Sequence, residues 1–170
     1  MRAQQKFFGR FVKDLKPGFL SWIGLRPAQW AAMLEVDTVM ALAGLGLEGD
    51  HRCQKTAGSA RQVTLISEEY IQLIAHFTGR KSLDPSLLRR NLVVKNLNLS
   101  ALRHQQFTIG DTLLEATAIC HPCSRMEQAL GKGGVAAMLG HGGLCAKIIS
   151  GGRIHVGDAV TVVSPQGDLF

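Results

Sequence analysis

"FTIGDTLLEAT" at residues 107–117 is the stretch that best indicates the fold, because a second stretch repeats its design. "IHVGDAVTVVS" at residues 154–164 also sets an apolar residue before Gly-Asp and then alternates apolar with polar residues. A Gly-Asp pair favours a tight turn, and alternation with period two is typical of a strand with one buried face. Two copies are too few for a solenoid, so the pair predicts two similar corners of a small β-barrel.

The segments around these corners are short, and most of them are predicted to be strands. One helix is clear, because residues 67–79 begin with Ser67, a good cap, and end at Gly79. Residues 84–90 open with Asp-Pro, which is typical of a helical turn. Strands do not alternate with long helices, so we predict a β-rich α+β fold, a β-barrel with a few short helices. The other expected strands are residues 19–25, 33–42, 61–66 and 91–94.

Length and composition favour a single globular domain. The chain has 170 residues, of which 46% are hydrophobic and 19% are charged, so it is long enough to bury a core. It contains no apolar run of roughly 18 residues, as a membrane span needs, and its first residues lack a secretory pattern. Four cysteines do not make a disulfide framework at this length. We therefore expect a cytoplasmic protein with free thiols.

Residues 1–17 are predicted to form a basic amphipathic helix ahead of a domain at 18–165 and a tail at 166–170. The simplest interpretation docks this helix on the domain, and a second interpretation is peripheral membrane contact. The formal net charge of +6 suits an anionic partner. Specific nucleic-acid binding is not expected, because no zinc-finger or RNA-recognition signature occurs. The apolar face of the helix comprises Phe7, Phe8, Phe11, Val12 and Leu15.

Cys120 and Cys123 flank a His-Pro pair in "CHPCSRMEQALG" (120–131), and three interpretations are open. Together with His141 and Cys145 they have the side chains of a zinc site. Their C-x-x-C spacing also permits a dithiol redox pair. In the third interpretation one thiol works alone, and its neighbour has at most a protective role.

Cys123 is the stronger candidate for a single reactive thiol. A strand pattern leads directly into Cys120, whereas a helical pattern begins only after Pro122, so Cys123 stands at a helix start. Free backbone N–H groups there and the nearby Arg125 favour the thiolate, which is both the nucleophile and the soft-metal ligand. Cys145 lies in a pattern typical of a buried strand, where cysteine is a small hydrophobe.

Two polar loops supply further candidates for ligand binding. "EGDHR" ends at Arg52, and "LRRN" at residues 88–91 contains Arg89 and Arg90. Arginine next to asparagine before a strand suits bidentate binding of an oxyanion. The glycine-rich loops match neither a dinucleotide fingerprint nor a P-loop, so those ligands are not expected.

In this order the motifs resemble the MOSC domain family, named for the C-terminal domain of molybdenum cofactor sulfurases. The resemblance covers most of residues 18–163 and indicates the small, stand-alone bacterial type. The matching blocks are "GLEGDHR" (46–52), "RQVTLI" (61–66), "RRNLVV" (89–94), "IGDTLLEAT" (109–117), "PCSRME" (122–127), "GHGG" (140–143) and "GGRIHVGDAV" (151–160).

The resemblance implies a β-rich barrel and a hallmark cysteine, which matches Cys123. In the family this thiol is proposed to ligate the molybdenum of the pterin cofactor, or to carry sulfur as a persulfide. Some members reduce N-hydroxylated compounds at that metal. A reductase of this size would need electron-transfer partner proteins, and a sulfur carrier would need sulfur-donor proteins. The residues expected to bind the anionic molybdopterin cofactor are Asp50, His51, Arg52, Arg90, Asn91, Arg125, His141 and Gly142.

Overall fold

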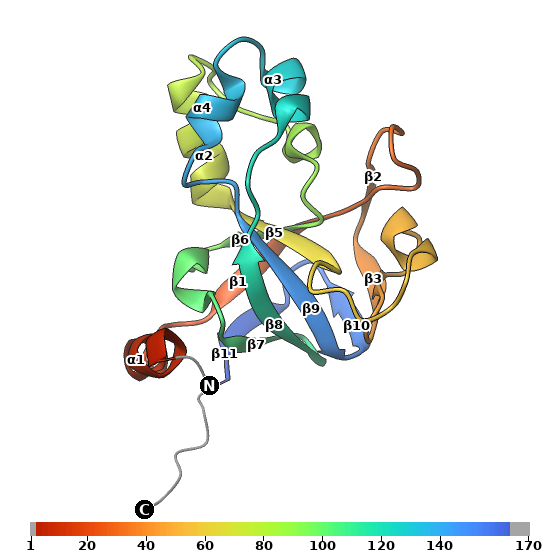
Figure 1. Cartoon of the computed structure of the whole chain (residues 1–170), viewed down its shortest axis with the longest axis vertical. Coiled ribbons are helices and arrows are strands. Elements are labelled where there is room, and N and C mark those ends of the chain that lie inside the picture. Colours follow the sequence, from red (N-terminus) through yellow and green to blue (C-terminus); the bar gives the residue numbers. More distant parts are fainter. Residues whose placement is uncertain (1–2, 164–170) are drawn as a thin grey trace, which may run out of the picture.

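The computed structural model describes residues 3–163, so the predicted tail at 166–170 lies outside the described residues. Seven strands close into a mixed β-barrel, because β11 (Ala159–Val162) pairs with β7 (Gln106–Ile109) on one side and with β1 (Gly18–Leu25) on the other. Three short helices lie at one end of the barrel, and the N-terminal helix lies at the opposite end (Figure 1). The predicted β-rich α+β barrel is confirmed.

The barrel strands follow one another in the order β11, β7, β8, β9, β5, β6 and β1, with β2 added outside β1. Of these pairings only β5 with β6 is parallel among the described strands. A smaller sheet contains β10, β3 and β4. The strands are β1 (Gly18–Leu25), β2 (Leu34–Val36), β3 (Thr38–Leu42), β4 (Gly46–Leu47), β5 (Val63–Ser67), β6 (Leu92–Lys95), β7 (Gln106–Ile109), β8 (Thr112–Ile119), β9 (Leu144–Ser150), β10 (Gly152–His155) and β11 (Ala159–Val162).

The helices are short, and α1 ends at Val12, not at residue 17 as predicted. Some of the helical elements begin at a residue whose side chain caps them. Ser67 caps α2, where its hydroxyl accepts a hydrogen bond from the Tyr70 backbone N–H. Asp84 caps the helical turn η2 in the same way, with Pro85 as its first residue. The helical elements are α1 (Ala3–Val12), η1 (His51–Gln54), α2 (Glu68–Phe77), η2 (Pro85–Leu88), η3 (Leu99–Leu102), α3 (Ser124–Leu130) and α4 (Gly134–Met138).

The two Gly-Asp corners are present, but they differ in what they join. Gly110 turns the chain between the paired strands β7 and β8, as a hairpin corner does. Gly157 instead carries the chain from β10 in the small sheet into β11 of the barrel. Both glycines have positive φ angles, 53° and 97°, which explains the residue type at each corner. The sequence repeat therefore marks two turns of like chemistry in different topological positions.

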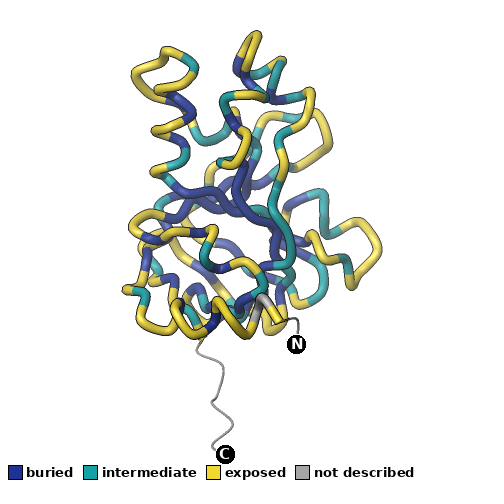
Figure 2. The backbone as a smooth tube through the Cα atoms, turned by 60° about the vertical axis from the view of Figure 1, so that its left-hand side comes forward, coloured by how far each residue is buried: buried dark blue, intermediate teal, exposed yellow. Residues whose placement is uncertain are grey.

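Two hydrophobic clusters stabilise the fold. The larger one fills the barrel, where Phe107, Leu65 and Ile23 have no exposed surface (Figure 2). The second lies between the barrel and the three helices at its end, around Ile74 and Met126. This second cluster holds α2, α3 and η2 above the strand ends, which is where the candidate site is built. Among residues 3–163, no helix is long and apolar enough to span a membrane.

The segment "GHGG" is explained partly by backbone packing. Gly143 has a φ of +91°, and a Cβ atom there would overlap the carbonyl oxygen of Leu65 in β5. A Cβ on Gly142 would overlap the carbonyl oxygen of Cys120. Both glycines let β9 begin close beside β5 and β8. By contrast, Gly140 also has positive φ but nothing lies within 4 Å of the space a Cβ would take.

We expect Gly143→Ala to destabilise the fold severely. A methyl group there meets rigid backbone as well as an unfavourable φ, so the loss should reach about 4 kcal/mol or prevent folding. Gly140→Ala is the matched control and should cost only about 1–2 kcal/mol, the penalty of the left-handed conformation alone. Urea unfolding of both variants measures the difference. Equal losses in the free energy of unfolding would show that the close approach of Gly143 to Leu65 does not affect stability.

Candidate functional site

The candidate site is assembled from loops at the barrel end that carries α2, α3 and α4 (Figure 1). Hydrogen bonds and ion pairs join segments that are far apart in sequence. The participating segments are 26–31 after β1, 50–52 at η1, 89–91 before β6, 120–125 after β8 and 140–145 before β9.

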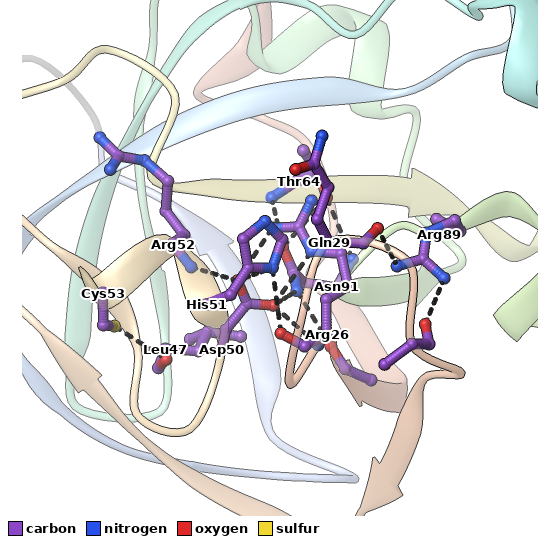
Figure 3. A network of polar contacts seen from close by, with 12 residues as sticks. Arg26, Gln29, Leu47, Asp50, His51, Arg52, Cys53, Thr64, Arg89 and Asn91 are labelled. Atoms are coloured by element: carbon purple, nitrogen blue, oxygen red, sulfur yellow. Dashed lines mark hydrogen bonds and ion pairs between the residues drawn. The ribbon is translucent and has the colours of Figure 1, made fainter. Parts of the chain in front are cut away.

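A buried carboxylate, Asp50, anchors the first part of the site (Figure 3). Its side chain is 1% exposed and pairs in a bidentate way with Arg26, at 3.0 Å to Nε and 3.1 Å to Nη2. Asp50 also accepts from the backbone N–H groups of Arg26 and Arg52, each at 2.9 Å. Burial alone would raise the pKa of Asp50, but these hydrogen bonds and the Arg26 charge outweigh it and lower that pKa. The carboxylate therefore stays ionised inside the protein.

Asn91 joins this ion pair to the barrel, and its whole side chain is engaged within the protein. The amide nitrogen donates to the Gly24 carbonyl at 3.0 Å and to Asp50 at 2.9 Å. The amide oxygen accepts from Arg26 at 3.2 Å and from Thr64 in β5. Asn91 thus ties the end of β1 to β5 and to Asp50. The prediction that Asn91 and Asp50 line a cofactor pocket remains a prediction, and their visible contacts hold the loops in place.

His51 and Arg52 follow Asp50 but point in different directions. The Nδ1 atom of His51 lies 3.1 Å from the carbonyl oxygen of Arg26, an acceptor, so this nitrogen carries a proton. Arg52 donates from Nε and Nη2 to the carbonyls of Arg61 and Thr56, and Figure 3 shows its guanidinium pointing away from Asn91. His51 and Arg52 therefore both contact backbone carbonyls of neighbouring loops, and their expected binding of a cofactor remains a prediction.

Arg90 is buried and fastens the strand ends beneath α3. Its Nε donates to the Gly142 carbonyl at 2.8 Å, Nη1 to the Leu88 carbonyl at 3.0 Å and Nη2 to the Cys120 carbonyl at 3.4 Å. These three bonds hold the "GHGG" loop, η2 and the end of β8 together. The predicted grip of Arg90 on a phosphate is untested, and the structure gives this guanidinium a positioning role.

Arg26, Arg89 and Arg125 form a cationic group around the loop after β1, which we call the arginine cluster. Arg89 donates to the carbonyls of Ala31 and Gln29 at 2.8 and 3.3 Å, and Arg125 donates to the same Gln29 carbonyl at 3.1 Å. Burial lowers the pKa of Arg89, and the charges of Arg125 and Arg26 lower it further. Like charges held this close favour an anion that would relieve their repulsion.

Two features of the arginine cluster bear on ligand binding. The Nε atom of Arg89 is buried and has no hydrogen-bond partner among the described residues. The guanidinium of Arg125 lies 4.0 Å from the ring centroid of Trp30, and that tryptophan is 75% exposed. A cation stacked on an exposed aromatic ring presents both charge and a flat apolar surface. This combination suits a planar, anionic molecule.

Cys123 is exposed and stands where the sequence predicts, immediately before α3. It occupies the cap position in an extended backbone conformation, and Ser124 begins the helix. Arg125 lies in the first turn, so the thiol and the arginine cluster belong to the same loop region. Cys123 therefore offers a soft, accessible sulfur beside a cationic surface.

Cys120 has a different partner from the one that C-x-x-C spacing indicates. In the β8–β9 pairing Ala118 lies opposite Cys145, so Cys120, two residues further on, shares the face of Cys145. A hydrogen bond from Cys145 lowers the pKa of Cys120 to about 6; burial opposes this change, and the charges of Arg90, Arg61 and Arg26 assist it. The same contact, together with burial, raises the pKa of Cys145. Cys120 and Cys145 thus form a thiolate–thiol pair.

Alkylation should reveal this order of thiol reactivity. At pH 7 we expect iodoacetamide to label Cys123, which is exposed, and Cys120, which is mostly thiolate, well before Cys145. Because the Cys120 pKa is about 6, its labelling rate should fall about tenfold between pH 7 and pH 5. Peptide mass spectrometry over a time course measures each site. A Cys145 rate equal to that of Cys123 in the folded chain would contradict the assignment.

His141 is held by aromatic contacts with α2. Its ring centroid lies 5.1 Å from that of Tyr70 and 6.0 Å from that of Phe77. Its Nδ1 atom is buried and has no hydrogen-bond partner among the described residues. Within residues 3–163 the structure contains no group of three or more His, Cys, Asp or Glu side chains able to hold a metal ion. The zinc interpretation of His141 with the three cysteines is therefore not supported.

Sequence reasoning did not single out Arg26, Trp30 or the Cys120–Cys145 pair. Arg26 directly follows the predicted strand at 19–25, and a charged residue at a strand end is a usable signal. Trp30 lies in a loop whose sequence matches no motif. The thiol pair depends on a register shift in the β8–β9 ladder, between Ala116 and Ala118, which local patterns cannot reveal.

Comparison with known proteins agrees with this architecture. The family model for the MOSC domain matches residues 51–161, which is more than half of the chain. The chain therefore belongs to the MOSC domain family. No curated protein sequence matches it.

Solved structures resemble the chain in fold. The YuaD protein from Bacillus subtilis has a TM-score of 0.74 at 18% identity, covering 89% of this chain and 98% of that one. YiiM from Escherichia coli has a TM-score of 0.66 at 20% identity, covering 88% of this chain and 72% of its own. YiiM from Geobacillus stearothermophilus has a TM-score of 0.71 at 14% identity, covering 89% and 78%. At these identities the likeness concerns the fold alone.

Proposed function

We propose that this MOSC protein binds the molybdenum cofactor, with Cys123 as the protein ligand to molybdenum, and reduces N-hydroxylated compounds. The observation that carries the proposal is the exposed Cys123 thiol next to the arginine cluster. A thiolate is a soft ligand suited to such a metal, and guanidinium groups suit the cofactor phosphate. When bound, the cofactor would supply two-electron redox chemistry.

The residues present fit this group. Arg89 has a buried Nε atom without a hydrogen-bond partner in the described part of the chain, and Arg125 presents its guanidinium stacked on Trp30. Residues 3–163 contain no group of several side chains that could hold a metal ion. The molybdenum cofactor brings ligands of its own to the metal, so the protein needs to supply only one further ligand, a cysteine. In this proposal Arg89 and Arg125 bind the anion, and Cys123 completes the metal shell.

The remaining site residues act by positioning. Asp50 neutralises and orients Arg26, and Asn91 fixes both of them against β5. Arg90 holds the loop that precedes Cys123 through the Cys120 carbonyl. Electrons would come from separate electron-transfer proteins, and the exposed Trp30 beside Arg125 offers an accessible surface for them.

Titration with the released anionic pterin tests the arginine assignment. Arg125→Ala should weaken binding by about 1.5–3 kcal/mol, the worth of a hydrogen bond to a charged group. Arg153→Ala is the matched control, because Arg153 is exposed on β10 in the smaller sheet. Calorimetric dissociation constants for both variants give the comparison. Identical affinities of Arg125→Ala and Arg153→Ala would remove the arginine cluster from the proposed site.

A second function is favoured by the thiolate–thiol pair. Cys120 lies three residues before Cys123 and is hydrogen-bonded by Cys145. Such a site suits a sulfur carrier, in which Cys123 holds a persulfide received from a sulfur-donor protein. Cyanide-labile sulfur on Cys123 without molybdenum would favour this function over the first. Molybdenum without labile sulfur would favour cofactor binding.

A further inference from the structure

Helix α1 presents three phenylalanines to solvent instead of burying them. The helix packs against η3, and its residues Gly9 and Val12 are buried. The exposed fractions of Phe7, Phe8 and Phe11 are 54%, 54% and 66%. The sequence left open whether the apolar face docks on the domain or contacts a membrane, and the structure docks only a narrow part of that face.

The three rings form a continuous aromatic patch. The ring centroid of Phe7 lies 5.3 Å from that of Phe8 and 5.6 Å from that of Phe11, both in edge arrangements. Beside the patch is a groove of about 520 Å³ between α1 and η3. Phe8 and Phe11 line it from α1, and Ala101 and Arg103 line it from the η3 side. The exposed aromatic surface therefore continues into a hollow that is partly apolar.

Cations surround the aromatic patch. We call Phe7, Phe8 and Phe11 together with these cations the aromatic face. Lys6 and Arg10 on α1 and Lys13 just after it are all exposed, as is Arg103 across the groove. Among the described residues none of these four cations takes part in an ion pair. Asp14 is the one acidic residue in the segment 3–18. The aromatic face therefore combines apolar rings with uncompensated positive charge.

We propose that the aromatic face binds the surface of an anionic lipid bilayer. Exposed aromatic rings partition into the interfacial region, while flanking lysine and arginine side chains reach the lipid phosphates. Each such cation near an anionic surface contributes to binding, and the contribution is weakened by salt. A second copy of the chain fits less well, because a symmetric contact through this face would set its cations against one another.

Membrane binding in this orientation leaves the candidate site accessible. Helix α1 lies at the end of the barrel opposite α3 and α4 (Figure 1). Cys123 precedes α3, so it would face away from the lipid and toward partners delivered from solution. The inference is independent of which reaction the site performs.

Sedimentation of the full chain with vesicles tests the proposal. We expect binding to vesicles of phosphatidylcholine mixed with phosphatidylglycerol, little binding to phosphatidylcholine alone, and loss of binding at high salt. The double variant Phe7→Ser/Phe11→Ser should bind at least about tenfold more weakly, because it removes two apolar anchors. Both side chains are more than half exposed, so the variant should fold normally, which circular dichroism checks.

Matched controls distinguish vesicle binding by the aromatic face from nonspecific vesicle binding. Phe77→Ser removes a phenylalanine of similar exposure, 56%, from α2 at the other end, and should bind like the unmodified chain. Lys6→Glu/Arg10→Glu should lose the preference for anionic vesicles. Equal binding to neutral vesicles, or vesicle binding unaffected by the α1 variants, would overturn the proposal. So would a stable dimer that the Phe7→Ser/Phe11→Ser variant dissolves, since it would assign the face to self-association.

Discussion

Cys123→Ser should abolish the loading of molybdenum or sulfur onto this chain. A serine hydroxyl is a hard, neutral group at pH 7 and cannot replace a soft thiolate as ligand or sulfur acceptor. Even partners outside the metal shell are typically worth about 10–100-fold in affinity, so losing the ligand itself should cost about a hundredfold or more. Elemental analysis and intact mass of the purified chain measure the loss. Because Cys123 is exposed, the change should leave stability nearly unaltered.

Two further cysteine variants make this result specific. Cys53→Ser removes a thiol that donates to the Leu47 carbonyl, away from the proposed ligand, and should load normally. Cys120→Ser should retain most loading under strong reductant, because Cys120 is paired with Cys145 and not with Cys123. If Cys120→Ser bound as little molybdenum or sulfur as Cys123→Ser, the single-thiol account would be wrong and a two-thiol site would replace it.

Asp50→Ala should be the most destabilising change among the predicted site residues. It would leave Arg26 without its ion-pair partner and one amide N–H of Asn91 without its acceptor, both in a largely buried setting. Breaking a buried ion pair by removing one member typically costs about 3–5 kcal/mol. Denaturant unfolding measures the loss. Asp37→Ala, at an exposed position, is the matched control and should stay within about 0.5 kcal/mol.

The pH dependence of stability offers a second test of Asp50. Its pKa is lowered in the folded state, so the carboxylate contributes its full stabilisation above its unfolded pKa, near 3.8. That contribution is lost as the pH falls through the lower folded value. The stability advantage of the unmodified chain over Asp50→Asn should therefore be constant near neutrality and shrink below about pH 4. An advantage that does not change between pH 7 and pH 2 would mean that folding leaves the pKa of Asp50 unshifted, which would contradict the assignment.

Local sequence patterns predicted most of the strands, the helix at 67–79 and the start of α3, because each depends on residues close together in the chain. The prediction of a single strand at 33–42 was wrong, because this segment forms β2 and β3, which belong to different sheets. Closure of the barrel through β1 and β11 could be expected only as a fold class, since register joins residues such as Gly18 and Val160. The amphipathic pattern of α1 was evident, yet it could not show which part of the apolar face would meet the barrel. Only tertiary contact decided that Val12 is buried and Phe11 is not.

The candidate site was predictable in composition but not in the division of roles. Arg26 meets Asp50 and Asn91 across separations of 24 and 65 residues, so no local motif contains the network. "RRN" indicated an oxyanion site, and the fold assigns its three residues different contacts. Arg90 and Asn91 bind the protein itself, whereas Arg89 joins the arginine cluster. Such a division depends on which side chains the strand ends bury, and that is set by packing.

The central claim is that this chain binds the molybdenum cofactor through Cys123 and the arginine cluster. The most direct test is the molybdenum-to-protein ratio of the full chain, purified from cells that make the cofactor and from cells that do not. We predict stoichiometric molybdenum in the first preparation, none in the second, and none in Cys123→Ser from either. A chain free of molybdenum in both preparations, with cyanide-labile sulfur on Cys123, would contradict the claim and leave sulfur carriage as the function.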